Sequence, residues 1–189
     1  LSITQFYSIG VAPDGTIIAG TQDNGTLVYK TDEQGVGDSE AWYETFGGDG
    51  GYSAADPTDS NYLYGEYVYL NIHRSTNGGG ANSSNYIYDA KMEDGALFIA
   101  PFILDPNNPN RLLGGAAELW VSDNVKDFSP SWTSLKGKTT NQASIKSIAV
   151  ARGNSDLIYI GHQDGEIYKT IDGTSPTPTW TQVDTVDMP

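Results

Sequence analysis

The feature that most constrains this sequence is a plan repeated four times along the chain. Each copy has an apolar strand, a turn, a second apolar strand ending in Gly, a third strand, a polar turn and then an aromatic residue. Steps of 44, 49 and 46 residues separate the equivalent turn positions Pro13, Pro57, Pro106 and Arg152. Steps of 45, 49 and 47 residues separate the strand-ending glycines Gly20, Gly65, Gly114 and Gly161. A small sheet of this kind cannot cover both of its own faces, so successive copies must stack on one another.

The apolar positions within each copy alternate with a period of two, as in Ile17 and Ala19 or Leu157 and Tyr159. This period is typical of strands, and no stretch shows the 3.6-residue period of a helix. We therefore predict an all-β fold, a β-propeller segment over 1–189 built from four four-stranded antiparallel blades. The predicted blades span approximately residues 5–46, 47–94, 95–138 and 139–189.

The amino-acid composition excludes some classes of binding partner and indicates where the protein is located. The 189 residues contain 24 acidic and 10 basic side chains, a formal charge of −14, and no Cys. A strongly negative field repels nucleic acid and anionic membrane surfaces, and no apolar run is long enough to span a bilayer. We expect no nucleic-acid partner, no membrane insertion, and a secreted or cell-surface location. Because the chain starts at Leu1 inside an apparent strand, we also expect it to be a piece of a longer protein.

A polar turn follows the third strand of every copy, with an aromatic residue further on. Its members are Asp32, Gly35 and Trp42; Ser75, Asn77 and Gly79; Ser122, Asp123 and Trp132; and Thr170, Asp172, Gly173 and Trp180. This pattern resembles, in degenerate form, the Asp-box or bacterial neuraminidase repeat, Ser/Thr-x-Asp-x-Gly-x-Thr-Trp. In such a turn an Asp or Asn side chain accepts backbone N–H groups, Gly supplies a positive φ, and Trp packs beneath the hairpin.

The resemblance extends over nearly the whole chain, to sialidase-like and sortilin-like propellers of large bacterial secreted proteins. It implies a ring of six to eight blades, which either the remainder of a larger chain or a second copy would complete. Sialidases of this fold family bind their substrate through three arginines. We expect Arg74, Arg111 and Arg152 to be surface residues on different parts of the blades, so sialidase activity is not expected.

Two carboxylates suggest an enzymatic alternative. Asp23 in GTQDNGTLVY and Asp49 in GGDGGY lie in segments that resemble those of xyloglucan-cleaving propeller glycosidases. Two carboxyl groups on either side of a sugar can hydrolyse a glycosidic bond. In those enzymes, however, the two Asp residues face each other across a cleft between two propellers, whereas here they occupy adjacent blades. The alternative function is therefore that of a glycoside hydrolase fragment acting on β-glucan or xyloglucan. Asp23 and Asp49 are its candidate catalytic residues.

The leading expectation is a non-catalytic module that contacts a protein or a glycan through its loops. Asp49, Tyr52 and Tyr67 are the candidate binding residues, because they fall near the start of a blade's first strand and in its Tyr-rich part. Aromatic faces can stack on sugars, but alternating Tyr residues also suit packing between blades. No metal-ligand motif or cofactor site is predicted; Ca²⁺ is the one ion that such oxygen-rich loops could hold.

Overall fold

The computed structural model describes residues 4–30, 42–81 and 83–184. They form four antiparallel sheets of four strands each, divided between two compact units, Leu1–Tyr88 and Asp89–Pro189. The first unit contains sheet I, with strands β1 (Phe6–Val11), β2 (Ile17–Thr21), β3 (Thr26–Tyr29) and β4 (Trp42–Phe46). It also contains sheet II, with strands β5 (Ser53–Ala55), β6 (Leu63–Glu66), β7 (Ile72–Ser75) and β8 (Asn85–Tyr86).

The second unit also contains two sheets of four strands each. Sheet III consists of β9 (Phe102–Asp105), β10 (Asn108–Gly115), β11 (Leu119–Ser122) and β12 (Thr133–Lys136). Sheet IV consists of β13 (Ile145–Ala151), β14 (Asn154–His162), β15 (Ile167–Thr170) and β16 (Thr181–Gln182). Among the residues described, helical structure is confined to one 3-10 turn, Ala90–Glu93, which Asp89 caps by accepting the Lys91 N–H at 3.1 Å.

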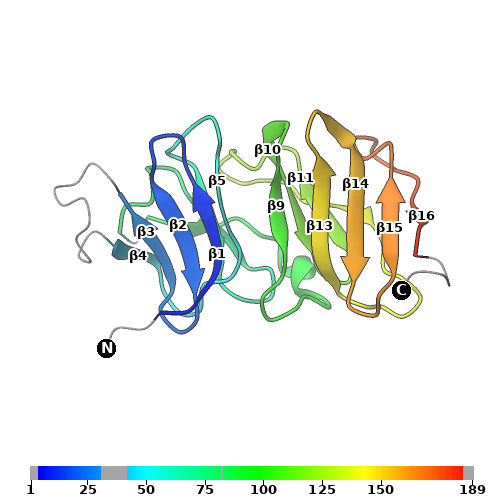
Figure 1. The fold of residues 1–189 in the computed structure, drawn as a ribbon, viewed down its shortest axis with the longest axis horizontal. Helices are drawn as coiled ribbons and strands as arrows, with labels where there is room; N and C mark the ends of the chain where they lie inside the picture. Colours follow the sequence, from blue (N-terminus) through cyan, green and yellow to red (C-terminus); the bar gives the residue numbers. More distant parts are fainter. Residues whose placement is uncertain (1–3, 31–41, 82, 185–189) are drawn as a thin grey trace. The chain divides into compact units, whose positions relative to one another are not determined.

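The prediction of an all-β chain with four four-stranded antiparallel sheets is confirmed. In every sheet the strands are hydrogen-bonded in chain order, each to the next (Figure 1). The order follows from the sequence, because short turns rich in Gly, Asp and Asn join consecutive strands and favour antiparallel neighbours.

Within each unit the sheets pack face to face through their first two strands. In the first unit β1 and β2 contact β5, and β2 also contacts β6; in the second unit β9 and β10 contact β13. The central strands β6, β7 and β11 are buried along their whole length, whereas the edge strands β8 and β16 are exposed. Burial on both faces of a central strand is what stacking on neighbouring sheets requires.

Glycines set how closely the first two sheets approach. A Cβ atom added to Gly10 would lie 2.7 Å from the Ala55 backbone nitrogen, and one added to Gly20 would lie 1.9 Å from the Gly51 carbonyl oxygen. Both distances are shorter than any real Cβ contact, so the close approach requires glycine at each position. Gly65 differs, because its added Cβ would meet Thr26 of sheet I and His73 instead. Gly20 and Gly65 are equivalent by spacing but not in space. Gly20 lies on the face of sheet I that packs on the segment leading to sheet II, whereas Gly65 lies on the face of sheet II that packs on sheet I.

Candidate functional site

The two candidate carboxylates meet at one end of the first unit. Asp23 lies in the turn between β2 and β3 with a φ of +61°, and its backbone N–H donates to Asp49 Oδ1 at 3.0 Å. Asp49 lies in the glycine-rich segment between sheets I and II, which Gly25 and Gly50 anchor to the same turn by backbone hydrogen bonds of 2.7 and 2.8 Å. The Asp49 carboxylate therefore holds the turn that carries Asp23. We call this end of the first unit, formed by residues 22–25, 47–52 and 66–71, the rim.

A buried carboxylate that the sequence analysis did not single out organises the rest of the rim. The Glu66 side chain is fully buried at the end of β6 and accepts the N–H groups of Tyr52 at 3.2 Å and of Leu70 at 3.0 Å. Its backbone carbonyl accepts the Gly51 N–H at 2.7 Å. Glu66 thus ties the start of sheet II to the turn between β6 and β7. The only local signal is a charged residue directly after an apolar strand, and that pattern is common in solvated turns.

The turn that Glu66 supports is strained and carries exposed aromatic surface. Tyr69 and Leu70 have φ values of +54° and +61°, which bulky residues rarely adopt. The Asn71 side chain donates to the carbonyls of Val68 and Tyr69 and holds this conformation. Tyr69 is 46% exposed. Strained backbone of this kind persists where its surroundings determine it, and such places cluster at binding sites.

The candidate binding residues Tyr52 and Tyr67 both belong to the rim. Tyr52 is half-buried and donates its N–H to Glu66. The half-buried Tyr67 ring lies against Gly48, where an added Cβ would be 2.5 Å from the ring, and its centroid is 6.5 Å from that of Phe46. The structure therefore brings Asp23, Asp49, Tyr52 and Tyr67 together, which the sequence could not establish because they come from three separate segments.

Below the rim, His73 forms part of the interior of the first unit. Its ring stacks on Phe46 with centroids 4.1 Å apart, and Nε2 lies 3.2 Å from Thr26 Oγ1. Burial lowers the pKa of His73 to about 3, because the charged imidazolium would lose its hydration there. The neutral ring therefore acts as a packing element between sheets I and II at physiological pH.

The polar turns after the third strands were expected to resemble Asp-boxes. Asp32 and Gly35 lie outside the described residues, while Trp42 begins β4 and packs on Tyr29 with centroids 5.3 Å apart. In the second turn Ser75 Oγ donates to Asn77 Oδ1 and accepts the Gly79 N–H, both within 2.9 Å, and Gly79 has a φ of +78°.

In the fourth turn the Asp172 carboxylate accepts the Thr179 N–H at 3.0 Å and the hydroxyl of Thr170. The next aromatic, Trp180, donates its indole N–H to the Leu135 carbonyl of sheet III at 3.2 Å. Gly173 does not adopt the positive φ expected of it; an added Cβ there would lie 2.5 Å from Ile158. Glycine is required at this position by close packing rather than by backbone conformation.

In the third turn the structure gives the turn-bonding role to Asn124 rather than to Asp123. Asn124 Oδ1 accepts the hydroxyl of Ser122 and the N–H of Ser131, while Trp132 is buried behind the turn. Asp123 is 71% exposed and forms an ion pair with Arg111 Nε at 3.1 Å. Counting two residues from the serine would have selected Asn124, as it selects Asn77 and Asp172 in the other turns.

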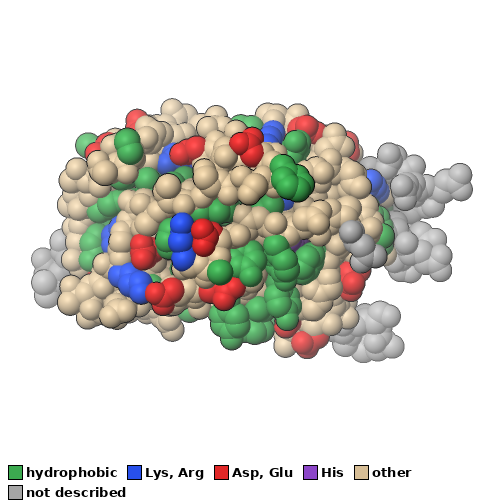
Figure 2. Space-filling model, turned by 180° about the vertical axis from the view of Figure 1, so that it is seen from behind, with side chains coloured by type: hydrophobic (Ala, Val, Ile, Leu, Met, Phe, Trp, Pro, Cys, Tyr) green, Lys and Arg blue, Asp and Glu red, His purple; other side chains and the backbone are tan. Residues whose placement is uncertain are grey.

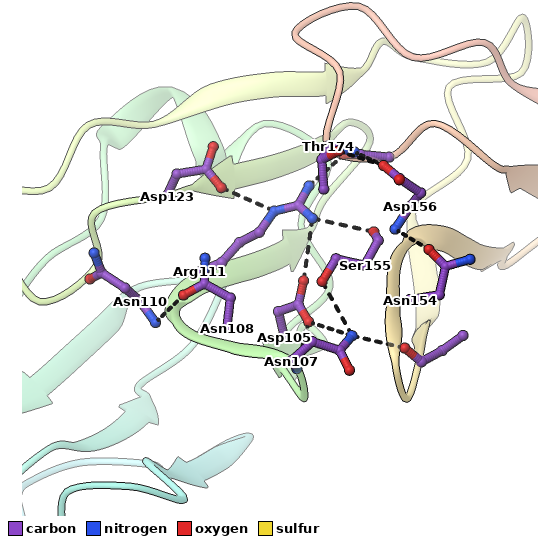
Figure 3. A network of polar contacts seen from close by, with 12 residues as sticks. Asp105, Asn107, Asn108, Asn110, Arg111, Asp123, Asn154, Ser155, Asp156 and Thr174 are labelled. Atoms are coloured by element: carbon purple, nitrogen blue, oxygen red, sulfur yellow. Dashed lines mark hydrogen bonds and ion pairs between the residues drawn. The ribbon is translucent and has the colours of Figure 1, made fainter.

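Arg111 is the centre of a polar network in the second unit (Figure 3). Its side chain is 3% exposed and pairs at 3.3 Å with the fully buried Asp105 carboxylate. The expected surface position is therefore wrong for Arg111, and also for the buried Arg74. The guanidinium also donates to the carbonyls of Ser155 and Gly173, which belong to sheet IV and the turn after β15. Next to it, Asn107 donates to the Ala151 carbonyl at 2.9 Å. These contacts satisfy a buried charge and link sheet III to sheet IV, so we assign Arg111 a structural role.

No metal-binding cluster is found: in 4–30, 42–81 and 83–184, no three His, Asp or Glu side chains gather in a way that could hold an ion. No helix in the described part of the chain is long and apolar enough to cross a membrane. Figure 2 shows acidic side chains at several separate places on the surface, interspersed with basic ones. The excess of negative charge is therefore not concentrated into one site on this face.

Comparison with solved structures identifies the fold. An ancestral GH74 enzyme matches with a TM-score of 0.67 and 17% identity, over 97% of this chain and 24% of that enzyme. The GH74 enzyme of Niastella koreensis matches with a TM-score of 0.61 and 21% identity, over 96% and 30%. The β-propeller domain of Myceliophteria thermophila Cps50 (Swd1) matches with a TM-score of 0.64 and 8% identity, over 96% and 59%. The chain has a β-propeller fold.

These similarities establish the fold alone, because sequence identity is low and the chain spans only about a quarter of the length of the ancestral GH74 enzyme. No protein-family model and no curated protein matches the chain.

Proposed function

We propose that this chain is a non-catalytic β-propeller module of a secreted or cell-surface protein, and that it binds a glycan through the rim of its first unit. The observation that carries the proposal is the hydrogen bond of 3.0 Å from the Asp23 N–H to Asp49 Oδ1. Through this bond the Asp49 carboxylate fixes the turn that carries Asp23 and so shapes the rim. Asp49, Tyr52 and Tyr67 are then binding residues rather than catalytic ones.

The chemistry of the rim suits a neutral polyhydroxylated ligand. The half-buried Tyr67 and the exposed Tyr69 supply aromatic surface, and the Asp23 and Asp49 side chains supply acceptors for hydroxyl groups. Glu66 and Asn71 hold the turn in place before any ligand arrives, which lowers the ordering cost of binding. The acidic balance of the chain disfavours anionic ligands.

The test is calorimetric titration with neutral oligosaccharides, including xyloglucan fragments, after a screen on a glycan array. Replacing Tyr69 or Tyr67 by Ala should weaken binding by about tenfold or more, equivalent to about 1.4 kcal/mol. Phe128→Ala is the matched control, because Phe128 is 99% exposed and lies in the other unit. Equal losses for all three variants, or no glycan bound at all, would rule out this ligand class and leave a protein partner as the alternative.

A second candidate function is glycoside hydrolysis by a fragment of a β-glucan- or xyloglucan-cleaving enzyme. It is favoured by the meeting of Asp23 and Asp49 at one rim and by the GH74 enzymes among the similar folds. Release of reducing sugar from xyloglucan, abolished separately by Asp23→Asn and by Asp49→Asn, would establish it. Binding without turnover would support the non-catalytic proposal.

A further inference from the structure

One face of sheet I presents apolar side chains to solvent. Phe6, Ile9 and Val11 on β1 are 50%, 61% and 61% exposed. The pairing of β1 with β2 places Ile9 opposite Ala19 and Val11 opposite Ile17 on this face, and Trp42 lies 5.7 Å from Phe6 between ring centroids. A hollow of about 370 Å³ on this surface is lined by Phe6, Tyr7, Ser8, Ile9, Ile17 and Trp42. We call this surface the leading face.

A bulge in β1 keeps the leading face continuous. The pairing shifts between Phe6 and Ser8, so that Phe6 is opposite Thr21 and Ser8 is opposite Gly20. An extra residue in one strand returns the next side chain to the same face of the sheet. Phe6 therefore joins Ile9 and Val11 instead of pointing to sheet II.

Sheet IV shows what normally covers such a face. Its pairing has the same shift at the same place, between Ile145 and Ser147, which makes Ile145, Ile148 and Val150 the counterparts of Phe6, Ile9 and Val11. In sheet IV these positions are covered: Ile145 and Val150 are buried in one cluster with Leu113 and Val121 of sheet III, and Ile148 packs against it. The leading face of sheet I thus has the side chains of an inter-sheet face, yet it remains exposed.

The opposite face of sheet IV shows the complementary situation. Its residues Ser147, Ala149, Tyr159 and Gly161 are the counterparts of Ser8, Gly10, Ile18 and Gly20, by which sheet I faces sheet II. In sheet IV they are accessible: Tyr159 is 39% exposed, and an added Cβ at Gly161 would meet only Ser147 among the described residues. Lys169 and Thr181, which pair in line with Tyr159, help to line a hollow of about 510 Å³ on this trailing face.

We propose that the leading face of one copy of this chain docks on the trailing face of sheet IV in a second copy. The two faces carry the two halves of a junction that the chain itself builds between sheets I and II and between sheets III and IV. The contact is heterologous, since different surfaces of the two copies meet. It uses sheet faces, whereas the proposed glycan ligand would use the rim, so either proposal can fail without the other.

The charge of the chain gives this association a distinctive salt dependence. Each copy carries a formal charge of −14, so two copies repel at low ionic strength. Among the described residues no charged side chain lines the hollow of the leading face, whereas Lys169 and Asp172 help to line that of the trailing face. Ion pairs across the contact would need charges on both faces, so the attraction must come from buried apolar surface. Added sodium chloride should therefore strengthen the association, whereas a contact made by ion pairs would weaken.

Sedimentation velocity of the full 189-residue chain, at increasing concentration and at two salt concentrations, tests the proposal. Ile9→Asp places a charge on the leading face and Tyr159→Asp places one on the trailing face. Both side chains are exposed, so each variant should fold, which circular dichroism checks. We expect each variant alone to sediment as a monomer, and Phe128→Asp, at a 99% exposed site, to behave as the wild type.

Mixing the two variants is the decisive step. Ile9→Asp retains an intact trailing face and Tyr159→Asp an intact leading face, so an equal mixture should form a heterodimer and no larger species. A wild-type chain that stays monomeric at every concentration would overturn the proposal. Wild-type self-association that survives both substitutions, or that the mixture does not restore as a heterodimer, would overturn this pairing of faces.

Discussion

The two units contain the same number of strands in the same order, yet they join their sheets by different means. In the first unit Gly10 and Gly20 allow backbone-to-backbone approach, beside a cluster of the buried side chains Ala12, Ile18, Val28 and Leu63. In the second unit eight aliphatic side chains fill the space, and the buried Arg111 network reinforces it. The difference teaches that one strand plan is compatible with either close backbone contact or side-chain packing.

In both junctions the residue after the repeated proline position donates to a serine hydroxyl, though from different atoms. In the first unit the Asp14 N–H donates to Ser60 Oγ at 3.3 Å, and in the second unit the Asn107 side chain donates to Ser155 Oγ at 3.2 Å. Asp14 and Asn107 each follow the repeated proline, and the two serines occupy the same place in the next repeat. The turn contact therefore recurs with the repeat, whereas the packing between the two sheets differs from one unit to the other.

The largest expected effect is on the second unit, from Arg111→Met. The substitution leaves the fully buried Asp105 carboxylate without its cation, and breaking a buried pair in this way costs about 3–5 kcal/mol. Hydrogen exchange should rise in the strands of sheets III and IV while those of sheets I and II keep their protection. Asp123→Asn is the control, since Asp123 is 71% exposed and its pair with Arg111 is worth less than about 1 kcal/mol. Equal losses for the two variants would contradict the assignment.

Acid should destabilise the first unit through His73. Its pKa is about 3 in the folded chain and about 6.5 when unfolded, so the unfolded state binds more protons between these values and stability falls as the pH falls. From pH 6.5 to 4 the loss should reach about 3 kcal/mol. Denaturant unfolding at several pH values measures it, and His73→Gln should flatten the slope in this window. An unchanged slope in that variant would show that another group is responsible.

Gly20→Ala should affect only the first unit. Its Cβ would lie 1.9 Å from the Gly51 carbonyl oxygen, and because the obstacle is backbone, sheets I and II must separate, at a cost of about 1–3 kcal/mol. Gly137→Ala is the matched control, because nothing lies within 4 Å of its added Cβ. Thermal unfolding of the two variants compares them; if both lower the midpoint equally, close approach is not what selects glycine at position 20.

The smallest effect is expected from Trp180→Phe, which removes the hydrogen bond of 3.2 Å to the Leu135 carbonyl while retaining an aromatic ring. A net hydrogen bond of this kind contributes about 1 kcal/mol. The loss should appear as faster hydrogen exchange at the β12 and β16 edges of the second unit. No change at either edge would mean that the ring alone supports the turn.

Much of the fold could be predicted from the sequence, because its signals are local. Alternation in Ile17 and Ala19 marks a strand, and turn residues such as Pro13 and Pro106 mark where strands reverse. The candidate site was only partly accessible. Asp49 could be selected from its glycine-rich segment, but Glu66 gives no local sign that it is buried and bonded to two backbone amides.

The sequence by itself determined the number of repeats, the strand order and the residues of the turns, since each depends on side chains only a few positions apart. The tertiary structure alone decided that Gly20 and Gly65 face opposite ways, that Glu66 is buried, and that the Asp49 carboxylate holds Asp23. The physical reason is that burial and hydrogen bonding at these positions depend on partners a turn or a whole repeat away, which only the stacking of sheets brings into contact.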